Sequence, residues 1–95
     1  MKYHDILKLH EVEKSLQQVI ADCRSLNVPR HQLDEMQSLT SAGEPGVALE
    51  NLCTQLYEYD VVVPLAVYNR IAMLGNAMTL DAARWEILAR GITDD

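Results

Sequence analysis

The chain of 95 residues contains no phenylalanine, two cysteines, four glycines and three prolines. Without phenylalanine, leucine, valine, isoleucine and methionine have to fill the interior. So few glycines and prolines, with 48% hydrophobic residues, fit a folded domain better than a disordered chain. The length suits one folded domain over residues 1–95 and is too short for two.

The two cysteines, Cys23 and Cys53, lie far apart and match no spacing typical of zinc or redox sites. Both fall on the apolar side of a helical pattern, where a free cysteine behaves as a small buried hydrophobe. We therefore expect reduced, structural thiols, as in a cytoplasmic protein.

Long hydrophobic runs are also missing. No stretch approaches the roughly 20 apolar residues that cross a bilayer. The opening "MKYHDILKLHEVEK" reaches charged side chains before any useful apolar run, which is unlike a secretion signal. These patterns predict a cytoplasmic protein without a membrane partner.

Basic residues are absent from the middle of the chain. Residues 42–64 contain Glu44, Glu50, Glu58 and Asp60 but no Lys or Arg, whereas the two signs nearly balance on either side. This segment holds most of the formal net charge of −6. An acidic surface repels nucleic acid and attracts basic proteins, with faster encounter at low salt. The charge therefore argues against direct nucleic-acid binding and favours a cationic protein partner.

Apolar residues recur at intervals of three and four, which predicts amphipathic helices. The first covers residues 5–26, with Asn27 as its stop. The second covers residues 29–40, with Pro29 in its first turn and Gly43 in the left-handed conformation just past its end. The third covers residues 45–59 and begins at Pro45. Its inner face is Leu49, Leu52, Cys53 and Leu56.

The rest of the chain predicts two more helices. "DVVVP" is β-branched and precedes a proline, which indicates an extended connector without a strand partner. A fourth helix starts near Pro64 and is broken at Gly75 and Asn76. A fifth is capped by Thr79 or Asp81 and runs to about residue 90, with Gly91 as its stop and a frayed "ITDD" tail. The expected fold is all-α, a compact single-domain bundle of about five short helices.

Catalytic and cofactor motifs are missing. "GEPG" lacks the Lys and the preceding strand of a phosphate-binding loop. His31 and Glu35 have helical spacing for sharing a metal ion, but a solvated surface pair is the commoner case. Glu58 and Asp60 could act as an acid/base pair only in a pocket that shifts the pKa of one of them. A DNA-reading helix would carry basic and amide side chains, whereas the third helix carries acids. We expect no enzyme activity, cofactor or metal.

A protein-binding surface is the remaining possibility. Tyr57 and Tyr59 offer large contact area with a polar tip, and Glu50, Glu58 and Asp60 around them can pair with Lys or Arg. Two alternatives stay open. Acids often only solvate a helix face, and tyrosines at a helix end often pack on their own domain, Tyr59 in particular because it shares a side with Leu52.

The same residues support a resemblance. "AGEPGVALENLCTQLYEYDV" followed by "VYNRIAMLG" resembles the MafI-type small immunity proteins of bacterial polymorphic-toxin and contact-dependent inhibition systems. The match covers residues 42–75, about a third of the chain. The connector "DVVVPLAV" is more apolar than the polar helix start associated with that family.

The resemblance implies a cytoplasmic all-α protein that neutralises the C-terminal domain of one cognate toxin, often a nuclease, and has no activity of its own. We expect the toxin domain to be a basic nuclease, an RNase in particular, bound by Glu50, Tyr57, Glu58, Tyr59 and Asp60, and the free protein to be a monomer. Two other functions stay open: a non-enzymatic helical adaptor, and an acidic inhibitor of a nucleic-acid-binding regulator.

Overall fold

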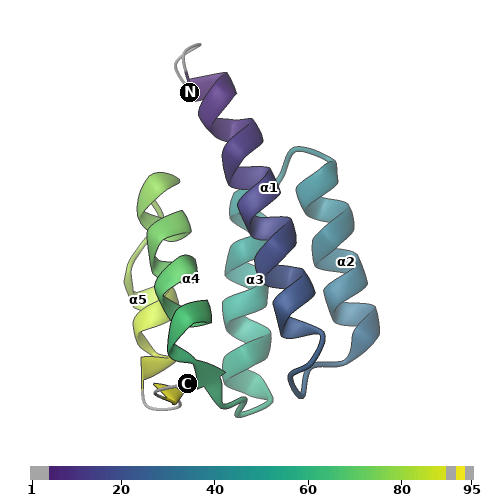
Figure 1. The fold of residues 1–95 in the computed structure, drawn as a ribbon, viewed down its shortest axis with the longest axis vertical. Coiled ribbons are helices and arrows are strands. Elements are labelled where there is room, and N and C mark those ends of the chain that lie inside the picture. Colours follow the sequence, from purple (N-terminus) through teal and green to yellow (C-terminus); the bar gives the residue numbers. More distant parts are fainter. Residues whose placement is uncertain (1–4, 90–91, 94–95) are drawn as a thin grey trace.

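The chain folds into helices that alternate in direction and are joined by short connections (Figure 1). A computed structural model describes residues 5–89 and 92–93, with only the backbone at residues 5–8 and 93. Within that part, the elements are α1 (Asp5–Cys23), α2 (Arg30–Ser41), α3 (Pro45–Glu58), β1 (Val63–Pro64), α4 (Leu65–Ala77), α5 (Ala83–Glu86) and β2 (Ile92–Thr93). The all-α prediction is confirmed.

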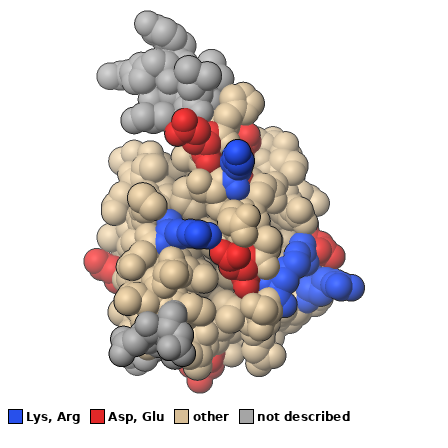
Figure 2. Space-filling view, in the orientation of Figure 1, with Lys and Arg blue, Asp and Glu red and all other residues tan. Residues whose placement is uncertain are grey.

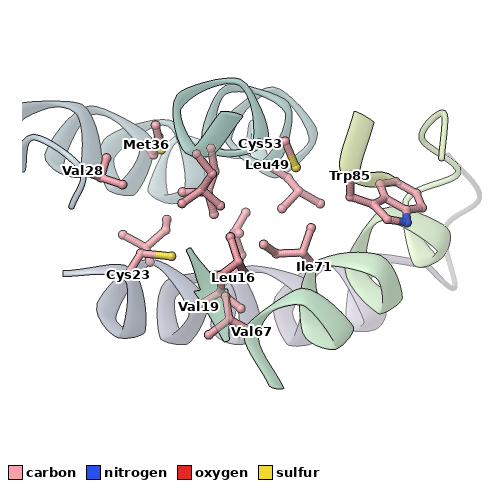
Figure 3. Close-up of a cluster of buried hydrophobic side chains, with 14 of the residues drawn as sticks. Leu16, Val19, Cys23, Val28, Met36, Leu49, Cys53, Val67, Ile71 and Trp85 are labelled. Atoms are coloured by element: carbon pink, nitrogen blue, oxygen red, sulfur yellow. The ribbon is translucent and has the colours of Figure 1, made fainter. Parts of the chain in front are cut away.

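The helices form two layers around one core. α1 and α4 lie in one layer; α3 lies in the other, beside α2 and α5 (Figures 1 and 3). Aliphatic side chains project from both layers into the space between them. The most completely buried include Leu16, Ile20, Leu33, Met36, Leu49, Leu52, Leu56 and Ile71. Cys23 and Cys53 are buried with them, as expected, and so is Trp85. Aliphatic residues thus do replace phenylalanine.

Three successive helices end in the same way. The residue after the last turn takes a left-handed backbone at Gly43 (φ 84°), Asp60 (φ 53°) and Thr79 (φ 60°). The next amide then donates to a carbonyl five residues back: Glu44 N to Leu39 O (2.9 Å), Val61 N to Leu56 O (3.0 Å) and Leu80 N to Gly75 O (2.9 Å). This is the Schellman geometry, which satisfies carbonyls that the helix leaves free. Gly43 was predicted; the other two were not.

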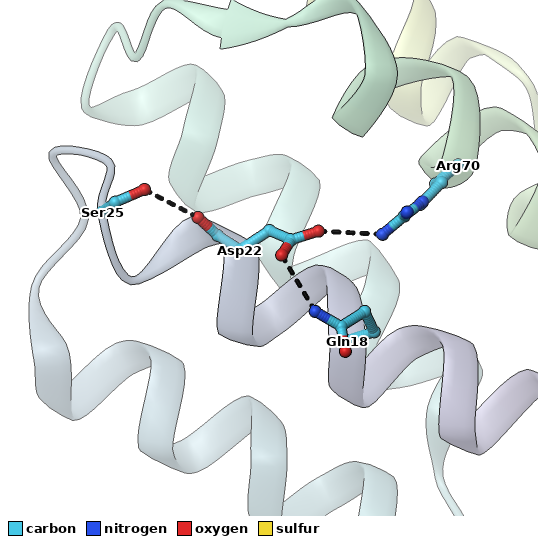
Figure 4. Close-up of polar contacts among 4 residues, drawn as sticks. All are labelled: Gln18, Asp22, Ser25 and Arg70. Atoms are coloured by element: carbon cyan, nitrogen blue, oxygen red, sulfur yellow. Dashed lines mark hydrogen bonds and ion pairs between the residues drawn. The ribbon is translucent and has the colours of Figure 1, made fainter.

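α1 ends at Cys23, three residues earlier than predicted. Beyond it, Ser25 Oγ donates to the carbonyl of Asp22 at 3.0 Å, which occupies an acceptor of the last turn. The side chain of Asp22 links α1 to α4. Its carboxylate accepts from Gln18 Nε2 at 3.0 Å and from Arg70 Nη1 of α4 at 2.9 Å (Figure 4). The polar end of α1 is therefore fastened to α4.

Gly75 does not break α4, which continues to Ala77. A Cβ at this position would lie 2.1 Å from Cζ3 of the buried Trp85. The glycine is therefore explained by the close approach of the indole, and the predicted break is wrong. The helix ends at Ala77, with Met78 as its C-cap and the left-handed Thr79 directly after it.

The connector after α3 does have a strand partner, contrary to prediction. Val63 pairs with Ile92 and Pro64 with Thr93 in a parallel two-stranded ladder. The "ITDD" tail is therefore ordered at Ile92–Thr93, whereas residues 94–95 lie outside the described part. The fifth helix is also shorter than predicted. Asp81 Oδ1 accepts from Ala83 N at 3.0 Å, as a cap would, but regular helix ends at Glu86. Residues 90 and 91, its predicted end, are not described.

Candidate functional site

Four of the five predicted binding residues lie at the C-terminal end of α3 or directly after it. Tyr57 is 47% exposed, Tyr59 is 44% exposed, and Glu58 and Asp60 are also exposed. We call these four consecutive residues the α3 tail. It lies at the end of the bundle where α3 passes into β1 (Figure 1). Tyr59 keeps much of its surface in solvent despite its proximity to Leu52 in the helical pattern.

Local sequence explains why the α3 tail faces outward. Leu52, Cys53 and Leu56 bury the inner side of α3, so helical geometry turns Glu58 to the opposite side. Asp60 then reverses the chain in a left-handed conformation, which Asp tolerates better than most residues, and Val61 returns to the core. Asp60 therefore has a structural role besides its charge.

The two carboxylates of the α3 tail take part in no ion pair among the described residues. There, no Lys, Arg or His nitrogen lies within 4.0 Å of Glu58 or Asp60. By contrast, Arg24 binds Asp34 and Arg70 binds Asp22, both at 2.9 Å. The face formed by α1 and α4 carries both signs among larger uncharged areas (Figure 2). Among the described residues, the α3 tail therefore has a local excess of negative charge.

Glu50 does not belong to this group. It lies seven residues before Tyr57, which corresponds to about 10 Å along a helix. Its side chain is 34% exposed, and its Oε2 lies 3.7 Å from Nε of Arg84, beside α5. The role of Glu50 in binding stays a prediction, and the sequence could not show that Arg84, 34 residues later, lies beside this carboxylate.

Three apolar residues near the α3 tail were not predicted. Val62 is 57% exposed, Ile87 is 43% exposed and Leu65 is 38% exposed. They lie in the β1 connector, just after α5 and at the start of α4, at the same end of the bundle (Figure 1). We call them the apolar fringe. The exposure of Val62 could have been predicted, because side chains of an extended segment alternate between two sides. Val61 and Val63 are buried, so Val62 faces solvent.

The cysteine thiols are poor nucleophiles. Burial raises the pKa of Cys23 from its ordinary value of 9.0 to about 12, with a smaller contribution from the charge of Asp22. Burial likewise raises the pKa of Cys53 to about 12. Both thiols stay protonated at neutral pH, whereas the thiolate is the reactive form.

The described residues offer little support for other kinds of site. His31 and Glu35 are exposed on α2, and the described side chains include no group of three or more His, Cys, Asp or Glu placed to hold a metal ion. None of the described helices combines the length and hydropathy that crossing a membrane requires.

Comparison of the chain with models of protein families, with curated proteins and with solved structures finds no match. The resemblance to MafI-type immunity proteins therefore stays a prediction. The α3 tail has to be interpreted from its own exposure, charge and surroundings.

Proposed function

We propose that this protein is an immunity protein that binds and neutralises a cognate bacterial toxin domain through the α3 tail. One observation carries the proposal. Tyr57 and Tyr59 leave nearly half of their surface exposed, next to Glu58 and Asp60, which have no described cation within 4.0 Å. Large aromatic side chains beside unneutralised acids suit a protein partner of opposite charge.

The partner chemistry follows from the charge. A toxin that cuts nucleic acid has to attract phosphate, so its cleft carries Lys and Arg. The α3 tail would complement that cleft or an adjacent basic surface, and the toxin we favour is a basic nuclease, an RNase in particular. Charge pairs at protein interfaces reach about 1.5–7 kcal/mol of coupling when they are close, whereas pairs at the rim contribute little.

The apolar fringe supports this position for the interface. Charged groups alone raise the association rate more than the affinity, and tight interfaces also bury apolar area at their centre. Val62 and Leu65 follow the α3 tail within a few residues, so one partner surface can cover both. We place the tyrosines and Val62 at the centre of the interface and the carboxylates around them.

Growth rescue tests the proposal. The candidate toxin is the C-terminal domain encoded by the reading frame immediately upstream, and it is expressed with or without this protein. Restored growth with the wild-type chain is expected, and loss of rescue with Glu58→Lys combined with Asp60→Gly. Glycine is chosen because lysine would strain the left-handed backbone at Asp60.

Glu35→Lys is the matched control, since it reverses one exposed acid on α2 that is not part of the α3 tail. Full rescue by the folded double variant would remove the α3 tail from the interface. Absence of rescue by the wild type would contradict the immunity function itself and favour a helical adaptor or an acidic inhibitor of a nucleic-acid-binding regulator.

The tyrosines provide a second test of the same surface. Tyr57→Ala and Tyr59→Ala are each expected to weaken toxin binding by about tenfold or more, as truncated aromatic anchors do. Both variants should keep the fold, because each side chain is already about half exposed. Calorimetric titration measures the affinity. Unchanged affinity in both variants would show that the tyrosines lie outside the interface.

A further inference from the structure

A groove of about 730 Å³ lies where α3 begins, at the end of the bundle opposite the α3 tail (Figure 1). Its walls come from α1, from the start of α3 and from the turn after α4. We call it the α3-start groove. Its volume falls within the range of sites that bind small ligands or inserted side chains.

The lining of the α3-start groove is apolar with acid at its edge. Its apolar residues are Leu9, Val12, Val47, Ala77, Met78 and Leu80. Among the described residues that line it, the charged side chains are Glu44 and Glu50, and none is basic. Within the described part of the chain, no cation lies within 4.0 Å of Glu44, and the Arg84 that faces Glu50 is exposed and 3.7 Å away.

Gly46 forms part of this groove, and its lack of a side chain has no explanation within the fold. Gly43 needs its positive φ of 84°, and Gly75 makes room for Trp85. Gly46 has neither reason: it is helical, and an added Cβ would meet only Leu80 Cδ2, at an ordinary 3.8 Å. Glycine costs helix stability relative to alanine. What it does here is leave the backbone of α3 open to the groove.

The opposite wall is held in shape. Met78, Thr79 and Leu80 form the turn after α4 and all line the groove. The Schellman bonds fix this turn, with Leu80 N donating to Gly75 O at 2.9 Å and Thr79 N to Asn76 O at 3.1 Å. Thr79 is a β-branched residue with φ 60°, a conformation in which such residues are outliers. A fixed wall lowers the ordering cost of binding.

From these observations we propose that the α3-start groove binds a short cationic segment of a partner protein. An apolar side chain of that segment packs beside Gly46 against Val47 and Leu80, and a Lys or Arg that neighbours it replaces Arg84 at Glu50. Charge complementarity selects this occupant, because the two charged side chains among the described lining residues are both acidic. The proposal does not depend on the immunity function, since the α3 tail lies at the other end of α3.

Peptide selection tests this proposal. A random dodecapeptide library on phage is selected against the wild-type protein and depleted against Gly46→Trp, whose side chain would fill the groove. His31→Trp is the matched control, because it adds an indole to an exposed position of α2 outside the groove, and it should bind as the wild type does. Circular dichroism and thermal unfolding confirm that each variant is folded. We expect the selected peptides to carry a Lys or Arg next to a large apolar residue.

The affinity of the selected peptide for a set of variants separates the contribution of the open groove from that of its acidic side chains. Gly46→Trp, and Glu44→Gln combined with Glu50→Gln, should each weaken binding by about tenfold or more. Arg84→Gln should tighten it by about two- to fivefold, because an exposed ion pair no longer competes for Glu50. Glu58→Lys combined with Asp60→Gly should leave this affinity unchanged.

Three results would overturn the proposal. One is that no peptide depends on Gly46. Another is that the selected peptides lack basic residues. The third is a wild-type dimer that Gly46→Trp dissociates, which would assign the groove to a second copy of the chain.

Discussion

Three residues that follow helix ends share a left-handed backbone but differ in the cost of adopting it. Gly43 takes this conformation freely, and Asp60 tolerates it. Thr79 is β-branched, and the left-handed region costs an ordinary residue roughly 1–2 kcal/mol. Because the side chain of Thr79 is exposed, its burial does not offset that cost.

Thr79→Gly should therefore stabilise the protein. Relief of the left-handed conformation exceeds the extra chain entropy that glycine brings to the unfolded state, for a net gain of about 1 kcal/mol in the free energy of unfolding. Urea denaturation measures it. Thr79→Ala is the control and should gain less, because alanine still has a Cβ. Equal stability of the two variants would contradict the explanation.

The buried thiols make stability depend on alkaline pH. Their pKa is about 12 in the folded protein and near 9.0 in the unfolded chain, so only the unfolded chain ionises between those values. The stabilising contribution is complete below pH 9 and is lost as the pH rises toward 12.

Urea denaturation from pH 8 to pH 11 checks this dependence. The wild type should lose stability above pH 9 more steeply than Cys23→Ala combined with Cys53→Ala, which has no thiol to ionise. A thiol reagent at pH 8 should also label both cysteines only after unfolding. Parallel pH profiles in the two proteins would show that the thiols do not contribute.

At the scale of elements, local sequence patterns were sufficient to predict the helices but not the pairing between distant segments. Periodicity and Pro45 give α3 to within one residue of its end, and the inner face of Leu49, Leu52, Cys53 and Leu56 is correct. The β1–β2 pairing was missed because it joins segments almost thirty residues apart, Val63 with Ile92. Such a two-residue ladder leaves no repeating pattern in either segment.

The same limitation applies to glycine. Gly75 carries a helix-breaking signal in the sequence, but its surroundings keep it inside α4, since Trp85 occupies the space that a side chain would need. Gly46 has the opposite character, with free space around it. The sequence alone does not distinguish these two glycines.

Matched alanine substitutions distinguish them. Gly75→Ala should lower the free energy of unfolding by about 3 kcal/mol, because the new methyl group collides with a rigid buried indole. Gly46→Ala should raise it by about 0.5–1 kcal/mol through better helix propensity. Thermal and urea unfolding measure both. Similar effects in the two variants would contradict the close approach of Trp85 to α4.

Over the whole molecule, the distribution of charge along the sequence matches the distribution on the folded surface only in part. Residues 42–64 contain no basic residue, yet folding places Arg84 beside Glu50. The consecutive residues Tyr57 to Asp60 needed no tertiary information to lie together, which is why the sequence could predict their proximity. Their exposure and the apolar fringe depend on how the connector and α5 pack, which the sequence did not show.

α3 therefore presents a different surface at each end. The α3 tail is exposed, aromatic and acidic, whereas the α3-start groove is concave and apolar with two acids. Both favour cationic partners, which agrees with the formal net charge of −6. The separate variants designed for each end allow the two surfaces to be tested independently in one molecule.

The central claim is that the negative charge of the α3 tail guides a cationic toxin domain to this protein. The most direct test is the association rate constant with the candidate toxin domain between about 50 mM and about 300 mM salt. We predict that the wild-type rate falls steeply with salt, and that Glu58→Lys with Asp60→Gly lowers the low-salt rate by about tenfold or more. A folded double variant that associates at the wild-type rate, with the same salt dependence, would contradict the claim.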